Sequence, residues 1–287
     1  WGEKTVVAFL EWKKAYDTVP HEDLLGKLKE VGVNGRTMAF LRGVYSRSRI
    51  SILSEIFGYE YLIDLERGLR QGCPLSPILF NVFINDVLHD EEWGVSVPIG
   101  DWSKAHLKAQ RRVEGESMSL GALAFADDIV LLSGSSEGIA TGLGEKEAWA
   151  EKWEMKFGVA KCGLMIVGGD SDDYDRSKFE LAGESIPHVK EYTYLGVRFD
   201  DSLSLDTMAR FRTEILRKRI FSASFFFKSK SIPILSKVDV LRTMIIPAFS
   251  YGSELFGMSS KRIMAAEMLV RKALRWIIGV ARKRVLI

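Results

Sequence analysis

The arrangement of apolar residues changes from one segment of the chain to the next. A continuous apolar run at residues 5–10 predicts a strand that is buried on both faces. Residues 20–31 come next and predict a helix, because Leu24, Leu25 and Leu28 recur at helical spacing. The chain therefore starts with a strand that feeds directly into a helix.

Elements of both kinds are predicted as far as residue 201. The predicted helices cover residues 37–45, 78–88 and 145–156, and the predicted hairpins and strands cover residues 50–64, 123–132, 164–167 and 179–189. Ser76 is expected to cap the second of these helices, with Pro77 in its first turn. Residues 93–119 and 168–178 are polar or rich in Gly, Asp and Ser, which predicts surface loops.

Beyond Asp201 the apolar period becomes helical. The repeating positions are Met208, Phe211 and Ile215, then Val238, Leu241 and Ile245, then Ile263, Ala266 and Val270. This pattern predicts a domain boundary near residue 202, with a mixed domain over residues 1–201 and helices over residues 202–287. The expected fold class is α+β.

Basic residues are concentrated in the predicted helical part. Residues 202–287 carry 17 Lys and Arg against 5 Asp and Glu, whereas residues 1–201 carry 23 against 33. This distribution is expected when one lobe binds a polyphosphate and the other holds cations. Surface helices that simply carry many basic side chains would give the same count.

Composition, the length of the apolar runs and the cysteine spacing limit the kinds of protein that this chain can be. The chain has 287 residues, 47% of them hydrophobic, which suffices for one large or two modest cores. No apolar run reaches the roughly 20 residues of a membrane span. The start, Trp1-Gly-Glu-Lys, has neither an initiator Met nor a signal peptide, so we expect part of a longer protein. The expected location is intracellular, in the nucleus or in an organelle such as the mitochondrion. Cys73 and Cys162 lack metal-ligand spacing and are expected to be free thiols.

Three acidic residues form the candidate chemistry. Asp127 and Asp128 lie between two apolar runs, which predicts a hairpin with both carboxylates at its turn, and Glu11 follows the first predicted strand. Two-metal phosphoryl transfer requires such carboxylates from separate elements, because two Mg²⁺ need shared oxygen ligands. Taken singly, each of these acids is more often a solvated residue.

Five segments in order resemble the successive palm motifs of reverse transcriptases. They are FLEWKKAYDTVP at 9–20, GLRQGCPLSPILFN at 68–81, FADD at 125–128, KCGLM at 161–165 and YLG at 194–196. A sixth, YGSE at 251–254, resembles the thumb of non-LTR retrotransposon enzymes. The resemblance covers nearly the whole chain. It implies a palm of antiparallel sheet and packed helices, a basic helical thumb and no fingers.

The resemblance implies catalytic roles for four residues. Glu11, Asp127 and Asp128 would bind the two Mg²⁺, and Lys161 would donate a proton to the departing pyrophosphate.

Nucleotide and primer contacts are implied at four further residues and one hairpin. Tyr16 matches the steric gate, an aromatic ring that would collide with a ribose 2′-hydroxyl, and Arg70, Gln71 and Gly72 match the loop that contacts template and nucleotide. Residues 194–196 match the primer-grip hairpin. Apart from the resemblance, these would be a core Tyr and two ordinary turns.

Two positions depart from the family pattern. Glu11 stands where the family has Asp, and its extra methylene displaces the carboxylate; a displacement of about 1 Å can cost on the order of 10²-fold in rate. Gly158 stands where related enzymes usually have Asn.

These observations leave two hypotheses. The first is a catalytically impaired descendant that serves as an RNA-binding or structural subunit of a larger ribonucleoprotein, such as an organellar ribosome, and needs no cofactor. The second is a fragment of an active RNA-directed DNA polymerase that uses two Mg²⁺. Both predict salt-dependent binding of RNA or an RNA/DNA duplex through the basic helices, and the first also predicts protein partners.

Overall fold

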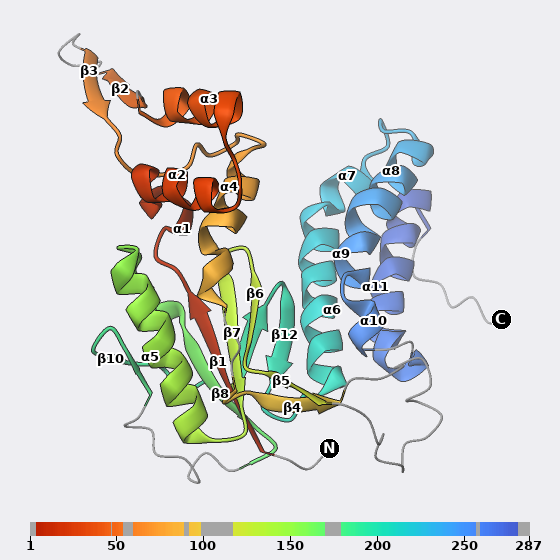
Figure 1. Cartoon of the computed structure of the whole chain (residues 1–287). Helices are drawn as coiled ribbons and strands as arrows, with labels where there is room; N and C mark the ends of the chain where they lie inside the picture. Colours follow the sequence, from red (N-terminus) through yellow and green to blue (C-terminus); the bar gives the residue numbers. More distant parts are fainter. Residues whose placement is uncertain are drawn as a thin grey trace. The chain divides into compact units, whose positions relative to one another are not determined.

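The computed structural model describes residues 4–46, 48–53, 60–88, 92–98, 117–169, 179–256 and 259–280. The chain divides into two compact units, Trp1–Lys190 and Glu191–Ile287, and each is described by itself (Figure 1). The boundary lies between residues 190 and 191, not near residue 202 as expected. The hairpin over residues 191–200 packs with the long helix over residues 205–222, so both belong to the second unit.

A four-stranded antiparallel sheet forms the centre of the first unit. Its strands are β1 (Thr5–Glu11), β6 (Ala122–Phe125), β7 (Asp128–Ser133) and β8 (Gly163–Val167), in the order β6-β7-β1-β8. The five inner residues of β1 are buried, as the continuous apolar run predicted. Sheet and helices together confirm the α+β class.

One helix, over residues 136–152, runs along this sheet, and the other α-helices of the unit lie towards one end of it (Figure 1). The helices of this unit are α1 (Ala15–Thr18), α2 (His21–Glu30), α3 (Gly35–Tyr45), α4 (Ser76–Ile84), the 3₁₀ turns η1 (Asn85–Val87) and η3 (Val159–Lys161), and α5 (Ser136–Lys152). Three small hairpins complete the unit: β2 (Arg49–Leu53) with β3 (Glu60–Asp64), β4 (Val95–Pro98) with β5 (Ser117–Leu120), and β9 (Glu180–Leu181) with β10 (Glu184–Ser185).

Three local predictions were wrong. Leu75, not Ser76, is the N-cap of α4, because the Ser76 hydroxyl donates to the Arg70 carbonyl instead (2.6 Å). Helix α5 begins at Ser136 rather than near 145, because the Ser135 hydroxyl accepts from the Gly138 amide and caps the helix there (3.0 Å). The described ends of residues 93–119 pair as β4 and β5, and residues 99–116 and 170–178 lie outside the described part of the chain.

Lys27 of α2 is buried in the first unit, with 4% of its side chain exposed. Its ammonium donates to the Phe83 carbonyl (2.6 Å) and to Asp86 (2.5 Å), and it lies 3.9 Å from the centroid of the Trp153 ring. Burial lowers the pKa of Lys27, although its hydrogen bond to Asp86 acts in the opposite direction. One cation thus joins α2 to α4 and to the end of α5.

Replacing Lys27 with alanine is expected to lower the free energy of unfolding by about 2–4 kcal/mol, because the Phe83 carbonyl loses its ammonium partner and a cavity forms. Urea unfolding measures the loss. Lys29 is exposed on the same helix, so Lys29→Ala serves as the control and should change stability by less than about 0.5 kcal/mol. Equal effects of the two substitutions would contradict a structural role for Lys27.

The second unit is a hairpin followed by helices. Its elements are β11 (Glu191–Tyr194), β12 (Val197–Asp200), α6 (Leu205–Ser222), α7 (Ser224–Lys228), α8 (Ile234–Val240), the π-helical turn η6 (Leu241–Ile245), α9 (Ile246–Ser250), α10 (Ser253–Phe256) and α11 (Ser260–Ile278). The core between these helices includes Leu216, Ile220, Phe227, Leu241 and Ile277. Helix α6 packs against α9 and α11, which confirms the helical period predicted after residue 201. None of the described helices combines the length and the apolar character needed to cross a membrane.

Candidate catalytic and nucleotide-binding site

The pairing register of β1 with β7 brings the three candidate carboxylates to one end of the sheet. Glu11, the last residue of β1, lies directly opposite Asp128, the first residue of β7. Asp127 precedes it in a two-residue turn that joins β6 to β7, and Ala126 begins this turn with a left-handed φ of 52°. The predicted hairpin is confirmed, and two acids more than a hundred residues apart in sequence become neighbours.

The carboxylates repel one another and attract a lysine. Burial raises the pKa of Asp128, and the charges of Asp127 and Glu11 raise it further. The ammonium of Lys161 donates to the Glu11 carboxylate, and this hydrogen bond, followed by the charge of Glu11, raises the pKa of Lys161. All four predicted catalytic residues therefore interact within one cluster.

The segment that carries Lys161 is anchored to the end of β1. The Gly158 amide donates to the Glu11 carbonyl (2.8 Å), and the ring of Trp12 stacks on Phe157 with centroids 3.9 Å apart. A Cβ at Gly158 would lie 3.7 Å from the Glu11 carbonyl oxygen, an ordinary contact. An added Cβ would therefore not clash, and nothing in the structure explains the glycine.

The predicted nucleotide-binding residues are also brought together. Tyr16 of α1 stacks on Phe80 of α4 with centroids 4.6 Å apart, and the Leu69 amide donates to the Tyr16 carbonyl (2.7 Å). Burial raises the pKa of Tyr16, and the charge of Asp127 adds to this effect, so the ring lies within electrostatic reach of the acids. The loop of residues 70–72 thus begins beside the aromatic ring.

Residues 70–72 of this loop differ in their contacts and in their backbone conformation. Gln71 donates to the Asp17 carboxylate (2.9 Å), so Asp17 is engaged away from the acidic cluster. Arg70 is exposed and reaches the Val44 carbonyl at 3.4 Å. Gly72 has a φ of 83°, and a Cβ there would meet no atom within 4 Å, so its left-handed backbone alone favours glycine.

His21 contributes to the site, although the sequence offered only an isolated histidine. Its ring nitrogen hydrogen-bonds the Gly68 carbonyl (2.8 Å), and the side chain is 5% exposed. Gly68 itself has a φ of 96°, and a Cβ there would lie 3.1 Å from the Asp17 carbonyl oxygen. His21 and Gly68 therefore fix the start of the 70–72 loop against the first motif, a long-range contact without a local sequence signal.

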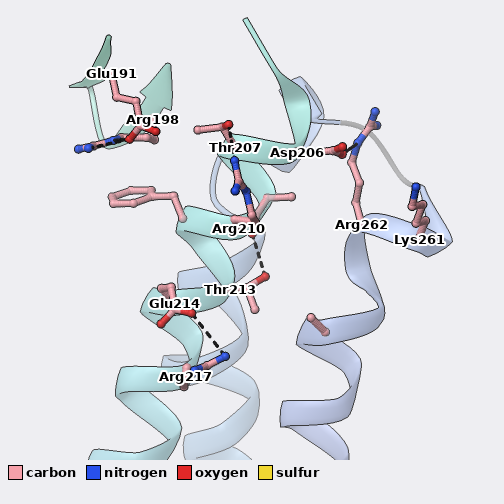
Figure 2. A pocket seen from close by; sticks show the side chains of 13 residues that line it. Glu191, Arg198, Asp206, Thr207, Arg210, Thr213, Glu214, Arg217, Lys261 and Arg262 are labelled. Carbon is pink, nitrogen blue, oxygen red and sulfur yellow. Dashed lines mark hydrogen bonds and ion pairs between the residues drawn. The ribbon is translucent and has the colours of Figure 1, made fainter. Parts of the chain in front are cut away.

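A basic groove lies within the second unit, with a volume of about 730 Å³ (Figure 2). It is lined by residues of β11, β12, α6 and the start of α11: Glu191, Arg198, Asp206, Thr207, Ala209, Arg210, Phe211, Thr213, Glu214, Arg217, Lys261, Arg262 and Ala265. Its three acids each pair with an arginine, and its two remaining basic residues, Arg210 and Lys261, pair with no acid of the described residues. The groove therefore has an excess of positive charge.

Comparison with known proteins decides the family. The profile of the family described as "Reverse transcriptase (RNA-dependent DNA polymerase)" matches residues 2–199. The chain belongs to the reverse transcriptase family. This reverse transcriptase domain is 23% identical over 290 residues to the "Retrovirus-related Pol polyprotein from type-1 retrotransposable element R2" of Popillia japonica, with 96% of the chain and 43% of that polyprotein covered.

Two further comparisons give lower coverage of the matched protein. The chain is 23% identical over 286 residues to the "RNA-directed DNA polymerase from mobile element jockey" of Drosophila melanogaster, covering 96% of the chain and 29% of that protein. A solved structure of apo telomerase from Candida tropicalis aligns with a TM-score of 0.44 at 14% identity, over 70% of this chain and 35% of the telomerase. The reverse transcriptase domain thus spans less than half the length of these relatives.

Reverse transcriptases use divalent metal ions, and Glu11, Asp127 and Asp128 are the candidate oxygen donors for such ions in this chain. Two carboxylates on adjacent strands and a third in the neighbouring turn supply the oxygen ligands that Mg²⁺ prefers, and their repulsion is what a bound cation would relieve. Within the described residues, however, no three acidic, histidine or cysteine side chains are arranged as a metal site. The Glu11 carboxylate is instead paired with the Lys161 ammonium. Glu11, Asp127 and Asp128 are the residues whose donor chemistry suits such an ion.

The raised pKa of Asp128 predicts a pH-dependent stability difference. The folded chain keeps the Asp128 proton at pH values where the unfolded chain has lost it, so the charged carboxylate costs stability above its folded pKa. That cost disappears as the pH falls through the folded pKa and below the ordinary value of 3.8. Without divalent cations, Asp128→Asn should stabilise the protein at neutral pH by less than about 1 kcal/mol, because the group is partly exposed.

Thermal unfolding of both proteins across this pH range measures the difference. The advantage of Asp128→Asn should vanish well below the ordinary Asp pKa of 3.8, where the wild-type carboxyl is neutral in both states. A variant that is less stable than the wild type at neutral pH would show that the three acids do not repel one another.

Proposed function

We propose that this chain carries the nucleotidyl-transfer centre and the duplex-binding lobe of an RNA-directed DNA polymerase, and that Glu11 slows its chemistry. The register that places Glu11 opposite Asp128, beside Asp127, is the observation that carries the proposal. It puts three hard oxygen donors from two strands at one end of the sheet. The same geometry would be unnecessary in a protein that only binds RNA.

Each residue of the cluster would have a separate task. Bound divalent cations would activate the primer 3′-hydroxyl and stabilise the leaving pyrophosphate, with Glu11, Asp127 and Asp128 as ligands. Tyr16, stacked on Phe80, would exclude a ribose 2′-hydroxyl and so select deoxynucleotides. The exposed Arg70 would be available to a phosphate or base edge of the template.

Lys161 would protonate the departing pyrophosphate, and its contact with Glu11 limits that task. A general acid works best with a pKa near the working pH, whereas the Glu11 carboxylate raises the pKa of Lys161. Glu11 therefore either neutralises Lys161 or binds a cation. Its greater length compared with aspartate favours the first of these states, which is the physical reason for a reduced rate.

The second unit would hold the nucleic acid. Its basic groove offers Arg210 and Lys261 as cations without an acidic partner among the described residues, which suits a polyphosphate backbone. RNA or an RNA/DNA duplex is the partner that this chemistry favours, and its affinity should fall steeply with salt.

A second candidate function rests on Glu11 itself. If its interaction with Lys161 persists in the presence of cations, the chain would be a non-catalytic RNA-binding or structural subunit of a ribonucleoprotein in the nucleus or an organelle. Primer extension on an RNA template separates the two functions, with Mg²⁺ and with Mn²⁺, whose looser geometric demands favour a displaced ligand. Incorporation of deoxynucleotides supports the polymerase. Duplex binding without incorporation under either cation supports the non-catalytic subunit.

A further inference from the structure

We propose that Arg212 is a positioning residue that, with Tyr251, locks the tip of the β11–β12 hairpin onto the helices of the second unit. The proposal rests on the proposed function and on the resemblance of residues 194–196 to the primer-grip hairpin, which would hold the primer strand. Arg212 reaches the hairpin from α6, and Tyr251 reaches it from the end of α9. The segments 194–196 and 251–254 therefore contact each other and would act together.

Arg212 is buried, with 8% of its surface exposed. One guanidinium nitrogen donates to the Gly196 carbonyl at the hairpin tip (2.5 Å), and another lies 3.5 Å from the Ala248 carbonyl of α9. Both acceptors are main-chain carbonyls, and no acid among the described residues forms an ion pair with this arginine. The planar guanidinium can address two carbonyls at once, which an ammonium on a flexible stem cannot do with the same geometry.

Tyr251 holds the neighbouring carbonyl of the same tip. Its hydroxyl donates to the Leu195 carbonyl (2.9 Å), and its ring lies 4.5 Å from the Arg212 guanidinium, a cation–π contact. Two consecutive carbonyls at the tip are thus bonded to side chains that also contact each other. Such a pair fixes the direction of the turn as well as its distance from the helices.

The backbone of the tip requires this support. Leu195 and Gly196 both adopt left-handed conformations, with φ of 46° and 74°, and such a conformation costs a non-glycine residue on the order of 1 kcal/mol or more. Gly252, which follows Tyr251, has a φ of 74°, and a Cβ there would lie 3.2 Å from Val197. The segment that begins with Tyr251 therefore approaches the hairpin so closely that its glycine has a steric reason.

Hydrogen exchange tests the lock without any catalysis. In Arg212→Lys and Tyr251→Phe, exchange of the amides of residues 194–197 should become about 10- to 100-fold faster, because a charge-assisted or phenolic hydrogen bond to the tip is lost. The control is Arg219→Lys, since Arg219 lies on the same helix and donates to a carbonyl away from the hairpin, that of Met244 (3.0 Å). Its tip exchange should stay within about 2-fold of the wild type.

A primer-end probe tests what the lock does. Fluorescence of 2-aminopurine at the primer 3′ end of a bound RNA/DNA duplex should report a more mobile terminus in both variants and no change in Arg219→Lys. In extension assays, KM for the primer–template should rise about 10-fold while kcat changes less, because duplex placement and not the acidic cluster is affected.

The outcomes are distinguishable. Unchanged tip exchange in both variants would overturn the lock, and Tyr251→Phe decides the matter if Arg212→Lys does not fold. Faster exchange with an unaltered primer end, or with no duplex binding by the wild type, would overturn the positioning role. Absence of extension by every protein, with the exchange and fluorescence results as expected, would count against the proposed polymerase alone.

Discussion

Replacing Glu11 with aspartate is expected to raise the rate of Mg²⁺-dependent primer extension by about 10²-fold. The shorter side chain would withdraw its carboxylate from Lys161 and, under the proposed function, would place it as a metal ligand opposite Asp128. Mg²⁺ demands near-ideal octahedral geometry at about 2.1 Å, so one methylene decides whether the ligand reaches the ion. Single-turnover extension on an RNA template measures the change.

Two further substitutions control this experiment. Glu11→Gln keeps the length and removes the charge, so it should extend no faster than the wild type. Lys161→Met removes the competitor for Glu11 together with the proposed general acid, so affinity for Mg²⁺ should improve while the chemical step does not. A Glu11→Asp protein that extends no faster than the wild type would refute the claim that side-chain length limits the rate.

Replacing Asp127 with asparagine is expected to lower extension by on the order of 10³-fold, to the background of the assay. Asparagine keeps the shape of the side chain and removes the negative charge that a divalent cation needs. The two-residue turn between β6 and β7 should still form, because its backbone is set by the strand pairing. A loss of a different size in the background of Glu11→Asp would show that the two positions are coupled at one site, because independent substitutions have additive effects.

A structural readout accompanies this loss of activity. The charge of Asp127 contributes to the raised pKa of Tyr16, so the pKa of Tyr16 should fall in Asp127→Asn. Tyrosine-labelled NMR titration resolves this residue from the other tyrosines. Asp64→Asn is the matched control, since Asp64 is an exposed acid that pairs with Arg49. Retained extension by Asp127→Asn, with an unchanged Tyr16 titration, would exclude Asp127 from the site.

Local patterns predicted most of the elements that carry the site. The apolar runs of β1 and β7 each contain enough β-branched and aliphatic residues to specify a buried strand, whereas three of the four residues of β6 are exposed. The start of α5 was missed because its first turns hold Gly138, Gly142 and Gly144, which weaken the helical pattern. The cap at Ser135 and packing against the sheet compensate for them.

The sequence by itself determined the α+β class, the order of the six motifs and their family, because these depend on residue types at fixed spacing. Only the tertiary structure decided which distant residues meet: Glu11 with Lys161, His21 with Gly68, and Arg212 with Gly196. The physical reason is that strand register and helix packing depend on the whole core. A side chain's partner across 150 residues leaves no signature in its own neighbourhood.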